Sequence, residues 1–310
     1  MCALTADRTL KMLSRSIDDY PEGIILPIDK PYRWTSADVI RKIKFAAVKH
    51  FGKKNLKVGH AGTLDPLATG VLIVCIGKAT KLAEEIQKSD KEYVAGITFG
   101  ATTPSYDLEK PIDKMYPTDG VSEDSVREAL KDFIGEQEQV APLFSAKSVD
   151  GVRAYELARK LYRSGGELDA QAEELLSRQW ITISATELLS FETGQRGTRE
   201  DGHGGNRRLW LPKREGTHFV GRIGGPSLPG LDSAGASGRI NVTDNSGLGL
   251  PRAEVRIACS KGTYVRAFAR DLGEALGTGA HLDSLQRSGC GAFRVEEALS
   301  LEEALALLQK

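Results

Sequence analysis

A glycine-rich loop surrounds one aspartate whose setting suits catalysis. The loop reads GHAGTLDPLATG and runs from Gly59 to Gly70. Asp65 precedes a proline, which disfavours helical backbone angles, so its carboxylate projects from an extended or turn backbone. His60 lies five residues earlier in the same loop. The glycines permit tight turns and the close approach of another backbone. Together these features predict a catalytic loop anchored by the apolar run that follows it.

Two other chemistries use similar residues, and the sequence favours neither. A P-loop requires Gly-x-x-x-x-Gly-Lys-Ser/Thr, and Gly77-Lys78-Ala79-Thr80 resembles only its end, without the upstream glycine. His60 and Asp65 provide only two candidate metal ligands. The remaining histidines, at 50, 203, 218 and 281, show no ligand spacing. We therefore expect neither a phosphate loop nor a metal site.

Both strands and helices are predicted around this loop. Short apolar or alternating runs predict strands at 23–28, 71–76, 93–99, 180–191 and 253–259. Apolar residues spaced three or four apart predict helices at 37–50, 122–134, 152–163 and 300–309. The order contains no regular βαβ repeat. We therefore expect an α+β fold with a mixed, largely antiparallel sheet flanked by helices.

Three regions differ in composition. Residues 1–22 are mixed and polar, and we expect a flexible N-terminal tail. Residues 23–310 carry the predicted elements, and we expect one catalytic domain. This domain is interrupted at 194–250, where 57 residues hold 14 of the 33 glycines. Such a composition buries too little apolar surface to offset the entropy of ordering, so we expect a long, disordered surface insertion.

The overall charge is zero, because 42 Lys and Arg residues balance 42 Asp and Glu residues. Taken alone, this balance argues against a nucleic-acid binder. The charges are unevenly distributed, however. Residues 23–81 hold eleven basic and three acidic residues, a local charge of +8, whereas residues 82–134 hold six basic and twelve acidic residues, a local charge of −6. The basic block contains the catalytic loop, so we expect phosphates to bind there and the affinity to fall with salt.

The sequence also indicates a cellular compartment. Its longest apolar run, Val71 to Ile76, is far shorter than the ~20 residues that span a bilayer. Charges at Asp7, Arg8 and Lys11 interrupt any signal-peptide apolar region. The four cysteines are widely spaced, without a CxxC pair, which argues against a zinc ribbon or a disulfide-rich secreted fold. We expect a cytoplasmic protein that does not bind membranes.

Several sequence blocks, in order, resemble one known family. The run 59–70 is similar to the catalytic loop of the TruB family of tRNA pseudouridine synthases, and GIILPIDKP, with Lys30 and Pro31, resembles that family's N-terminal motif. Further blocks that resemble family motifs are GKATK at 77–81, KEY at 91–93, FSA at 144–146, GVRAYELAR at 151–159, CSKGTYVR at 259–266, DLG at 271–273 and AHL at 280–282. The resemblance covers about 23–163 and 252–304, and it implies a pseudouridine-synthase-like fold.

The resemblance also implies roles for individual residues. Asp65 is implied to be the nucleophile, Arg266 its ionic partner, and Tyr93 the ring that stacks on the flipped target base. Three further positions are implied to bind substrate: Tyr264 and Leu285 line the uracil pocket, and His60 fills the space that the flipped nucleotide leaves. Lys30 belongs to the N-terminal motif and is included among the binding residues.

The implied reaction is the isomerisation of uridine to pseudouridine at position 55 in the T-loop of tRNA. It breaks the N1–C1′ bond and rejoins the base through C5, without gain or loss of electrons or groups, so we expect neither cofactor nor metal. A carboxylate suits this step as it suits glycoside cleavage, and attack at C1′, attack at C6 and proton abstraction all remain open. The base must leave its stack to react. We expect the T stem-loop of tRNA as partner and a monomeric enzyme.

Two alternatives remain open from the sequence. One is an RNA-binding chaperone that folds tRNA without essential catalysis, and the other is the same chemistry on another RNA. The chain also departs from the family pattern: Thr103–Asp107 replaces a Thr-x-Thr sequence, and Ser148 stands where the family has a lysine. We expect no appended C-terminal RNA-binding domain, since little sequence follows the last motif.

Overall fold

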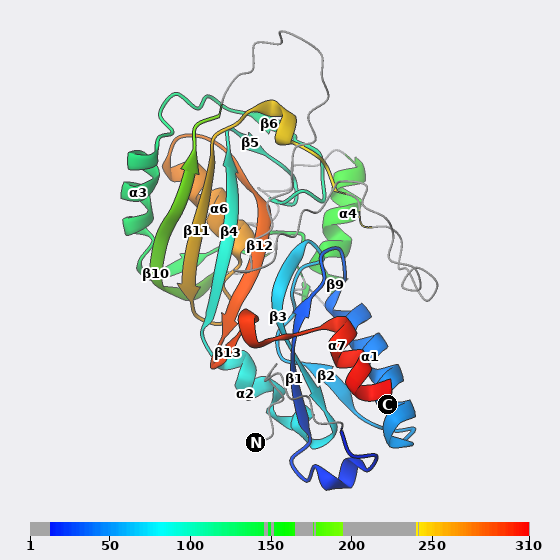
Figure 1. Ribbon diagram of the computed structural model, residues 1–310. Helices are drawn as coiled ribbons and strands as arrows, with labels where there is room; N and C mark the ends of the chain where they lie inside the picture. Colours follow the sequence, from blue (N-terminus) through cyan, green and yellow to red (C-terminus); the bar gives the residue numbers. More distant parts are fainter. Residues whose placement is uncertain are drawn as a thin grey trace, which may run out of the picture.

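The computed structural model describes residues 13–145, 148–149, 152–164, 176, 178–194, 240 and 242–309. One ten-stranded sheet extends through this part of the molecule, with helices against it (Figure 1). The strands follow the order β14 (Leu299–Ser300), β1 (Ile24–Lys30), β3 (Ala68–Ile76), β12 (Ala280–Cys290), β4 (Lys91–Phe99), β11 (Arg252–Cys259), β10 (Gln179–Glu192) and β7 (Gly135–Gln139). In addition, β2 (Val58–His60) pairs with β3, and β13 (Phe293–Arg294) pairs with β12.

The strand directions confirm the expected α+β fold with a mixed, largely antiparallel sheet. Only β1–β14 and β3–β12 are parallel pairs in the described sheet, and its other pairs are antiparallel. Two small hairpins stand apart from it: β5 (Ala101–Thr102) with β6 (Lys114–Met115), and β8 (Ser148–Val149) with β9 (Val152–Arg153).

Four helices cover the two halves of the sheet. In one half, α1 (Ser36–Phe51) packs on α7 (Leu301–Gln309), beside β1 and β2 (Figure 1). In the other half, α3 (Glu123–Asp132) packs on β10, and α6 (Val265–Ala275) packs on β12 and β4. The remaining helical segments are α2 (Ala83–Lys88), α4 (Ala154–Ser164) and the short 3₁₀ turns η1 (Ile17–Asp19), η2 (Gly77–Leu82), η3 (Ser246–Leu248) and η4 (Val295–Glu297).

The start of α1 shows how the local sequence sets an element. Thr35 accepts a hydrogen bond from the backbone N–H of Asp38, and the Asp38 carboxylate accepts one from the Thr35 backbone in return. This capping box satisfies two N–H groups that have no partner inside the helix. The helix ends before Gly52, which adopts φ 63°. Val39, Ile43 and Ala47 form its buried face, as their spacing predicts.

The two halves of the sheet meet where β3 runs parallel to β12. In this register Leu285 pairs with Ala68, and Arg287 pairs with Gly70. Gly70 has φ +94°, and a Cβ atom built on it would lie 2.2 Å from the Arg287 carbonyl oxygen. Glycine is therefore required here both for its backbone angles and for the close approach of β12.

Some expectations about elements were wrong or incomplete. Strand β12 was not predicted, because its sequence AHLDSLQRSGC has polar residues and a glycine in place of clear alternation. Residues 13–22 are not a free tail, since Leu13 and Ile17 lie in the main core. Two apolar side chains are enough to attach this otherwise polar segment to the domain. Residues 1–12 lie outside the described part.

The glycine-rich insertion is mostly outside the described residues, but its last part is described. The backbone N–H of Thr243 donates to the carbonyl of Leu108 at 2.8 Å, and η3 follows. On the opposite side, Arg33 donates to the carbonyl of Ile240 at 2.8 Å. Residues 242–250 are therefore held by hydrogen bonds, although their composition alone predicted disorder.

The described residues include three free cysteines. Cys75, Cys259 and Cys290 are buried free thiols, and burial raises the pKa of Cys75 and Cys259 to about 11. No described helix combines the length and the apolar character needed to cross a bilayer.

Candidate functional site

The Asp65 loop connects β2 to β3 and is fixed at its centre by the start of α1. The hydroxyl of Ser36 donates to the Leu64 carbonyl at 3.0 Å and accepts from the Leu64 N–H at 2.9 Å. The backbone N–H of Arg33 donates to the carbonyl of Pro66 at 3.0 Å. Asp65 therefore lies between two residues that are tied to the β1–α1 connection, so its backbone has little freedom.

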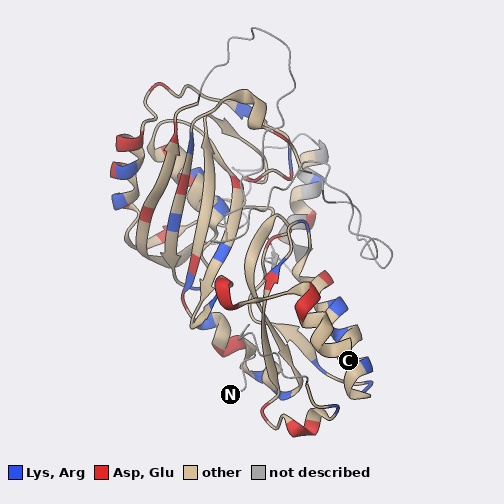
Figure 2. Ribbon diagram, viewed as in Figure 1, with Lys and Arg blue, Asp and Glu red and all other residues tan. Residues whose placement is uncertain are grey.

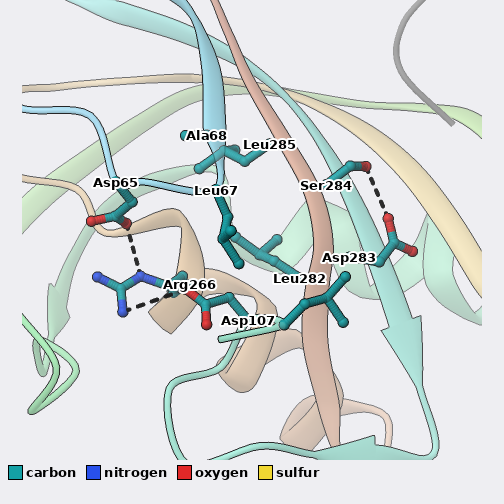
Figure 3. Close-up of a pocket in the computed structure, with 10 residues that line it drawn as sticks. Asp65, Leu67, Ala68, Asp107, Arg266, Leu282, Asp283, Ser284 and Leu285 are labelled. Atoms are coloured by element: carbon teal, nitrogen blue, oxygen red, sulfur yellow. Dashed lines mark hydrogen bonds and ion pairs between the residues drawn. The ribbon is translucent and has the colours of Figure 1, made fainter. Parts of the chain in front are cut away.

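Asp65 forms an ion pair with Arg266. Its Oδ2 lies 2.9 Å from Nε of Arg266, which belongs to the first turn of α6 (Figure 3). The Asp65 side chain is 38% exposed, whereas that of Arg266 is only 6% exposed. The carboxylate is thus open to a ligand on one side and faces a buried cation on the other. This arrangement keeps a negative charge available at the surface of a site that is otherwise largely buried.

A second carboxylate, Asp107, lies on the far side of the same guanidinium. Its Oδ2 is 3.9 Å from Nη1 of Arg266, and its Oδ1 accepts hydrogen bonds from the Ser105 hydroxyl at 2.6 Å and the Glu109 N–H at 2.9 Å. Burial raises the pKa of Asp107, and Arg266 opposes this rise. Arg266 is therefore the counter-ion for two carboxylates.

The guanidinium of Arg266 is fixed by backbone as well as by charge. It donates to the carbonyls of Ser105 at 3.2 Å and Phe144 at 2.9 Å. Burial opposes its charge, but Asp65 and Asp107 outweigh that effect, and the pKa of Arg266 is raised. The sequence left open that Arg266 begins a helix on the surface. It does stand in the first turn of a helix, but its side chain is buried.

A pocket opens beside this ion pair (Figure 3). It is lined by Asp65, Leu67, Ala68, Asp107, Leu108, Arg266, Leu282, Asp283, Ser284 and Leu285. Its apolar lining comes from Leu67, Ala68, Leu108, Leu282 and Leu285. Asp65, Asp107 and Arg266 stand at one side, and Asp283 and Ser284 stand at the other (Figure 3). An apolar slot with one reactive, partly exposed carboxylate at its edge suits a planar ring held next to a reacting atom.

The predicted residues do not all line this pocket. Asp65, Arg266 and Leu285 do. Tyr264 is the N-cap residue of α6 and packs on a neighbouring cluster that contains Phe144 and Leu143. Burial raises the pKa of the Tyr264 hydroxyl. Tyr264 therefore lies next to the site without belonging to the pocket lining.

Tyr93 and His60 lie behind the loop. Tyr93 is in β4, is 9% exposed, and belongs to the main core. His60 ends β2, and its Nδ1 is a buried atom without a hydrogen-bond partner. Burial lowers the pKa of His60, and the nearby Arg287 lowers it further. Neither ring is among the residues that line the pocket, so a base held there would contact Tyr93 only after a rearrangement.

Lys30 lies beneath the loop and is fully buried. Its Nζ donates to the carbonyls of Trp34 at 2.6 Å, Pro31 at 3.0 Å and Pro66 at 3.2 Å. Burial lowers its pKa to about 7, against the opposing effect of Asp65. Lys30 thus joins the β1–α1 connection to the Asp65 loop, and it is not among the residues that line the pocket.

Sequence reasoning missed three charged residues at or next to this site: Asp107 and Asp283, which line the pocket, and Arg287. Asp107 stands in the segment Thr103–Asp107 that departs from the family pattern, and it follows Tyr106, whose φ is 55°. Arg287 lies on the unpredicted strand β12. The segment around Asp107, ATTPSYDLEKP, is polar, so the sequence did not indicate that Asp107 is buried. For Arg287 there was no local signal, because its partners come from distant parts of the chain.

The basic block predicted from the sequence is largely an exposed helix face. On α1 and the turn that follows it, Arg41, Lys44, Lys49, Lys53, Lys54 and Lys57 are all exposed. Blue residues gather along α1 in Figure 2, while α3 carries acidic and basic residues together. The helix starts at the Asp65 loop, so this positive face extends away from the pocket. Among the described residues, no three His, Cys, Asp or Glu side chains gather to hold a metal.

Comparison with known proteins gives consistent results. A family model described as "TruB family pseudouridylate synthase (N terminal domain)" matches residues 48–196. Curated relatives named "tRNA pseudouridine synthase B" include one from Phocaeicola vulgatus, 42% identical over 92% of both chains. Another, from Flavobacterium johnsoniae, is 36% identical over 93% of this chain and 98% of its own length.

Solved structures are more distant in sequence. A chain in "Crystal Structure of a Cbf5-Nop10-Gar1 Complex" superposes with a TM-score of 0.54 and 21% identity, over 98% of this chain and 62% of that one. At this identity the likeness concerns the fold alone.

Proposed function

The chain belongs to the TruB family of pseudouridylate synthases and isomerises uridine to pseudouridine in tRNA, and we propose that it acts on the T-loop uridine at position 55 with Asp65 as nucleophile. The observation that carries the proposal is the Asp65–Arg266 ion pair, 2.9 Å between Oδ2 and Nε, at the edge of an apolar pocket. The T-loop target follows from the resemblance of the sequence blocks to family motifs.

The reaction exchanges one bond for another within a single nucleoside. The N1–C1′ bond breaks, the uracil turns, and a C5–C1′ bond forms, while the proton on C5 is lost and N1 gains one. A carboxylate can assist by adding to C1′, as in retaining glycosidases, or by adding to C6 of the ring. Both routes require Asp65 ionised and within bonding distance of the flipped nucleotide.

Arg266 supports this chemistry through its charge. A carboxylate in a low-dielectric pocket is stabilised in its ionised form by an opposite charge within about 4 Å. Asp65 needs such a partner when the bound nucleotide displaces water from its exposed side. Arg266 is already in place and is held by two carbonyls, so little reorganisation is required when the substrate arrives.

The remaining residues bind the flipped nucleotide in this proposal. Leu285 forms part of the apolar lining, and Tyr264 lies at its border. Tyr93 stacks on the base once the pocket opens towards it, and His60 fills the space left in the T-loop. Lys30 ties the loop, through the Pro66 carbonyl, to the carbonyls of Pro31 and Trp34 in the β1–α1 connection.

The proposal also covers the oligomeric state and the cellular compartment. We propose that the enzyme acts as a monomer on the T stem-loop, because one chain supplies both members of the ion pair. Its substrate, tRNA, places it in the cytoplasm. Size-exclusion chromatography with light scattering, with and without tRNA, tests the monomer.

The experiment uses unmodified tRNA transcripts labelled with tritium at C5 of uridine. Formation of the C5–C1′ bond releases this tritium, and chemical mapping then locates the pseudouridine. We expect release from the full-length tRNA and from its isolated T stem-loop, and none when uridine 55 is replaced by cytidine. We expect Asp65→Asn to bind the RNA and release nothing. Asp124→Asn, an exposed change on α3, is the matched control.

Each outcome bears on a separate part of the proposal. Full modification by Asp65→Asn would end the role of Asp65. Pseudouridine only at other tRNA uridines would end the T-loop assignment. RNA refolding without any tritium release would favour the chaperone alternative.

A further inference from the structure

Arg287 is the largest fully buried side chain among the described residues, with 1% of its surface exposed. It lies on β12, directly beside the β3 end of the Asp65 loop. A buried guanidinium normally lies next to a carboxylate, because an isolated charge is costly to remove from water. Among the described residues, no carboxylate lies within salt-bridge distance of Arg287. Its partners are uncharged groups of the site.

The guanidinium joins the two ends of the Asp65 loop. Its Nη2 donates to the carbonyl of Gly62 at 3.3 Å, and its Nε donates to the carbonyl of Val71 at 2.7 Å. These two residues bracket the segment that carries Asp65. One rigid planar group thus fixes the separation between the start and the end of the loop.

The glycines of the loop also face Arg287. A Cβ atom on Gly62 would lie 3.5 Å from its Nη1, and one on Gly70 would lie 2.2 to 2.8 Å from its backbone. The close approach of the Arg287 backbone therefore explains the glycine at position 70, whereas Gly62 is favoured by its φ of +100°. The chain closes around Arg287, and only glycine at position 70 allows that approach.

Arg287 also lies beside the tyrosine that is proposed to stack on the base. Tyr93 on β4 is its direct neighbour in the antiparallel β12–β4 register. Burial raises the pKa of the Tyr93 hydroxyl, and the positive charge of Arg287 opposes this rise. The ring that is to stack on the base and the loop that carries the nucleophile therefore share one support.

We propose that Arg287 is a positioning residue, which closes the Asp65 loop at both ends and orients Tyr93 against it. This inference rests on the proposed function of Asp65 and Tyr93. A role in packing alone explains the observations less well, since apolar residues of similar volume are often no less stable than a buried charge. The rigid fork of arginine suits the two carbonyls of Gly62 and Val71, which are held in fixed directions.

The test measures the single-turnover rate with saturating tRNA and, separately, the Kd for tRNA. We expect Arg287→Met to lower the rate about 100-fold, the usual scale for a misplaced catalytic group. Arg287→Lys keeps the charge but not the fork, and we expect a loss of about 10-fold. The Kd stays within about 3-fold in both, because phosphate contacts dominate affinity. Val126→Ala, a buried change on α3, controls for lowered stability.

A double-mutant cycle then tests the link to Tyr93. If Arg287 orients this ring, adding Tyr93→Phe to Arg287→Met lowers the rate no further. If the rate losses of Arg287→Met and Tyr93→Phe multiply in the double variant, Arg287 does not act through Tyr93. If folded Arg287 variants have the same single-turnover rate as Val126→Ala, Arg287 is not a positioning residue. If Arg287→Met does not fold, the same criterion applies to Arg287→Lys. A wild-type protein inactive on every tRNA uridine would instead overturn the proposed function.

Discussion

Arg266 and Arg287 are both buried and both reach the loop that carries Asp65, but their guanidinium groups have different partners. Arg266 faces two carboxylates, Asp65 and Asp107, beside the pocket (Figure 3). Arg287 lies behind the loop and donates to the carbonyls of Gly62 and Val71. One cation therefore acts on the charge of the site, and the other acts on its geometry.

The difference predicts distinct consequences of removal. Loss of Arg266 leaves Asp65 and Asp107 without their shared counter-ion, and it removes the charge that opposes the raised pKa of the buried Asp107. Loss of Arg287 leaves the loop ends unpaired, which changes where Asp65 stands. The first defect depends on pH and the second does not, so the two roles can be separated by experiment.

The largest effect is expected from Arg266→Met. Removing a preorganised electrostatic partner costs up to about 1000-fold in rate. Burial already raises the pKa of Asp107, and without Arg266 that pKa rises further. The residual activity should therefore increase with pH as Asp107 ionises. Single-turnover rates across a pH series measure both effects, and a pH-independent loss smaller than that of Arg287→Met would break the comparison.

Lys30 is a third buried cation beside the loop, and its effect is expected on stability. Burial lowers its pKa to about 7, so above pH 7 the unfolded chain binds more protons than the folded one. Its contribution to stability therefore rises with pH until the unfolded pKa is reached. Relative to Lys30→Met, the wild type should gain about 2 kcal/mol between pH 7 and pH 9.

Urea unfolding of both proteins at the two pH values measures this gain. Lys44→Met, an exposed change on α1, serves as the control and should follow the wild type. Parallel pH dependence of wild type and Lys30→Met would show that Lys30 does not titrate in this range.

Asp107→Asn should have a smaller effect than loss of Arg266. The amide keeps an oxygen for the Ser105 hydroxyl and the Glu109 N–H but removes one of the two charges that hold the guanidinium. We expect a fall of about 10-fold in the single-turnover rate, the scale of one charged hydrogen bond. Asp124→Asn on α3 should retain the full rate. An unchanged rate in Asp107→Asn would restrict the electrostatic role to the Asp65–Arg266 pair.

The smallest effect is expected on the exposed face of α1. Replacing Lys44 and Lys49 by Gln should weaken tRNA binding and make it less sensitive to salt. The slope of log affinity against log salt concentration should fall by about 0.7 to 0.9 for each phosphate that the protein no longer neutralises. The rate at saturating tRNA should remain unchanged. Arg127→Gln with Lys131→Gln on α3 is the matched control. Binding titrations across a salt series measure these slopes. Equal slopes in the α1 and α3 double variants would exclude α1 from the RNA-binding surface.

Much of the fold was predictable because its elements carry local patterns. The helix at 37–50 became α1, bounded by Ser36 and Phe51, and the strand at 93–99 became part of β4. Strand β12 was missed because its pairing with β3 and β4, rather than its own alternation, makes it a strand. The docked residues 242–250 were missed for a similar reason, since their order depends on hydrogen bonds to Leu108 and its surroundings.

The sequence by itself determined the α+β class, the reactive loop with Asp65 at its centre and the resemblance that leads to the family. Only the tertiary structure decided what surrounds Asp65: it placed Asp107 on Arg266, and Arg287 behind the loop. Arg287 and Val71 are 216 residues apart and meet because β3 pairs in parallel with β12. Short-range patterns record which face of an element is buried. These patterns do not indicate which distant element will pack against that face. The packing of distant elements determined the partners of both Arg266 and Arg287.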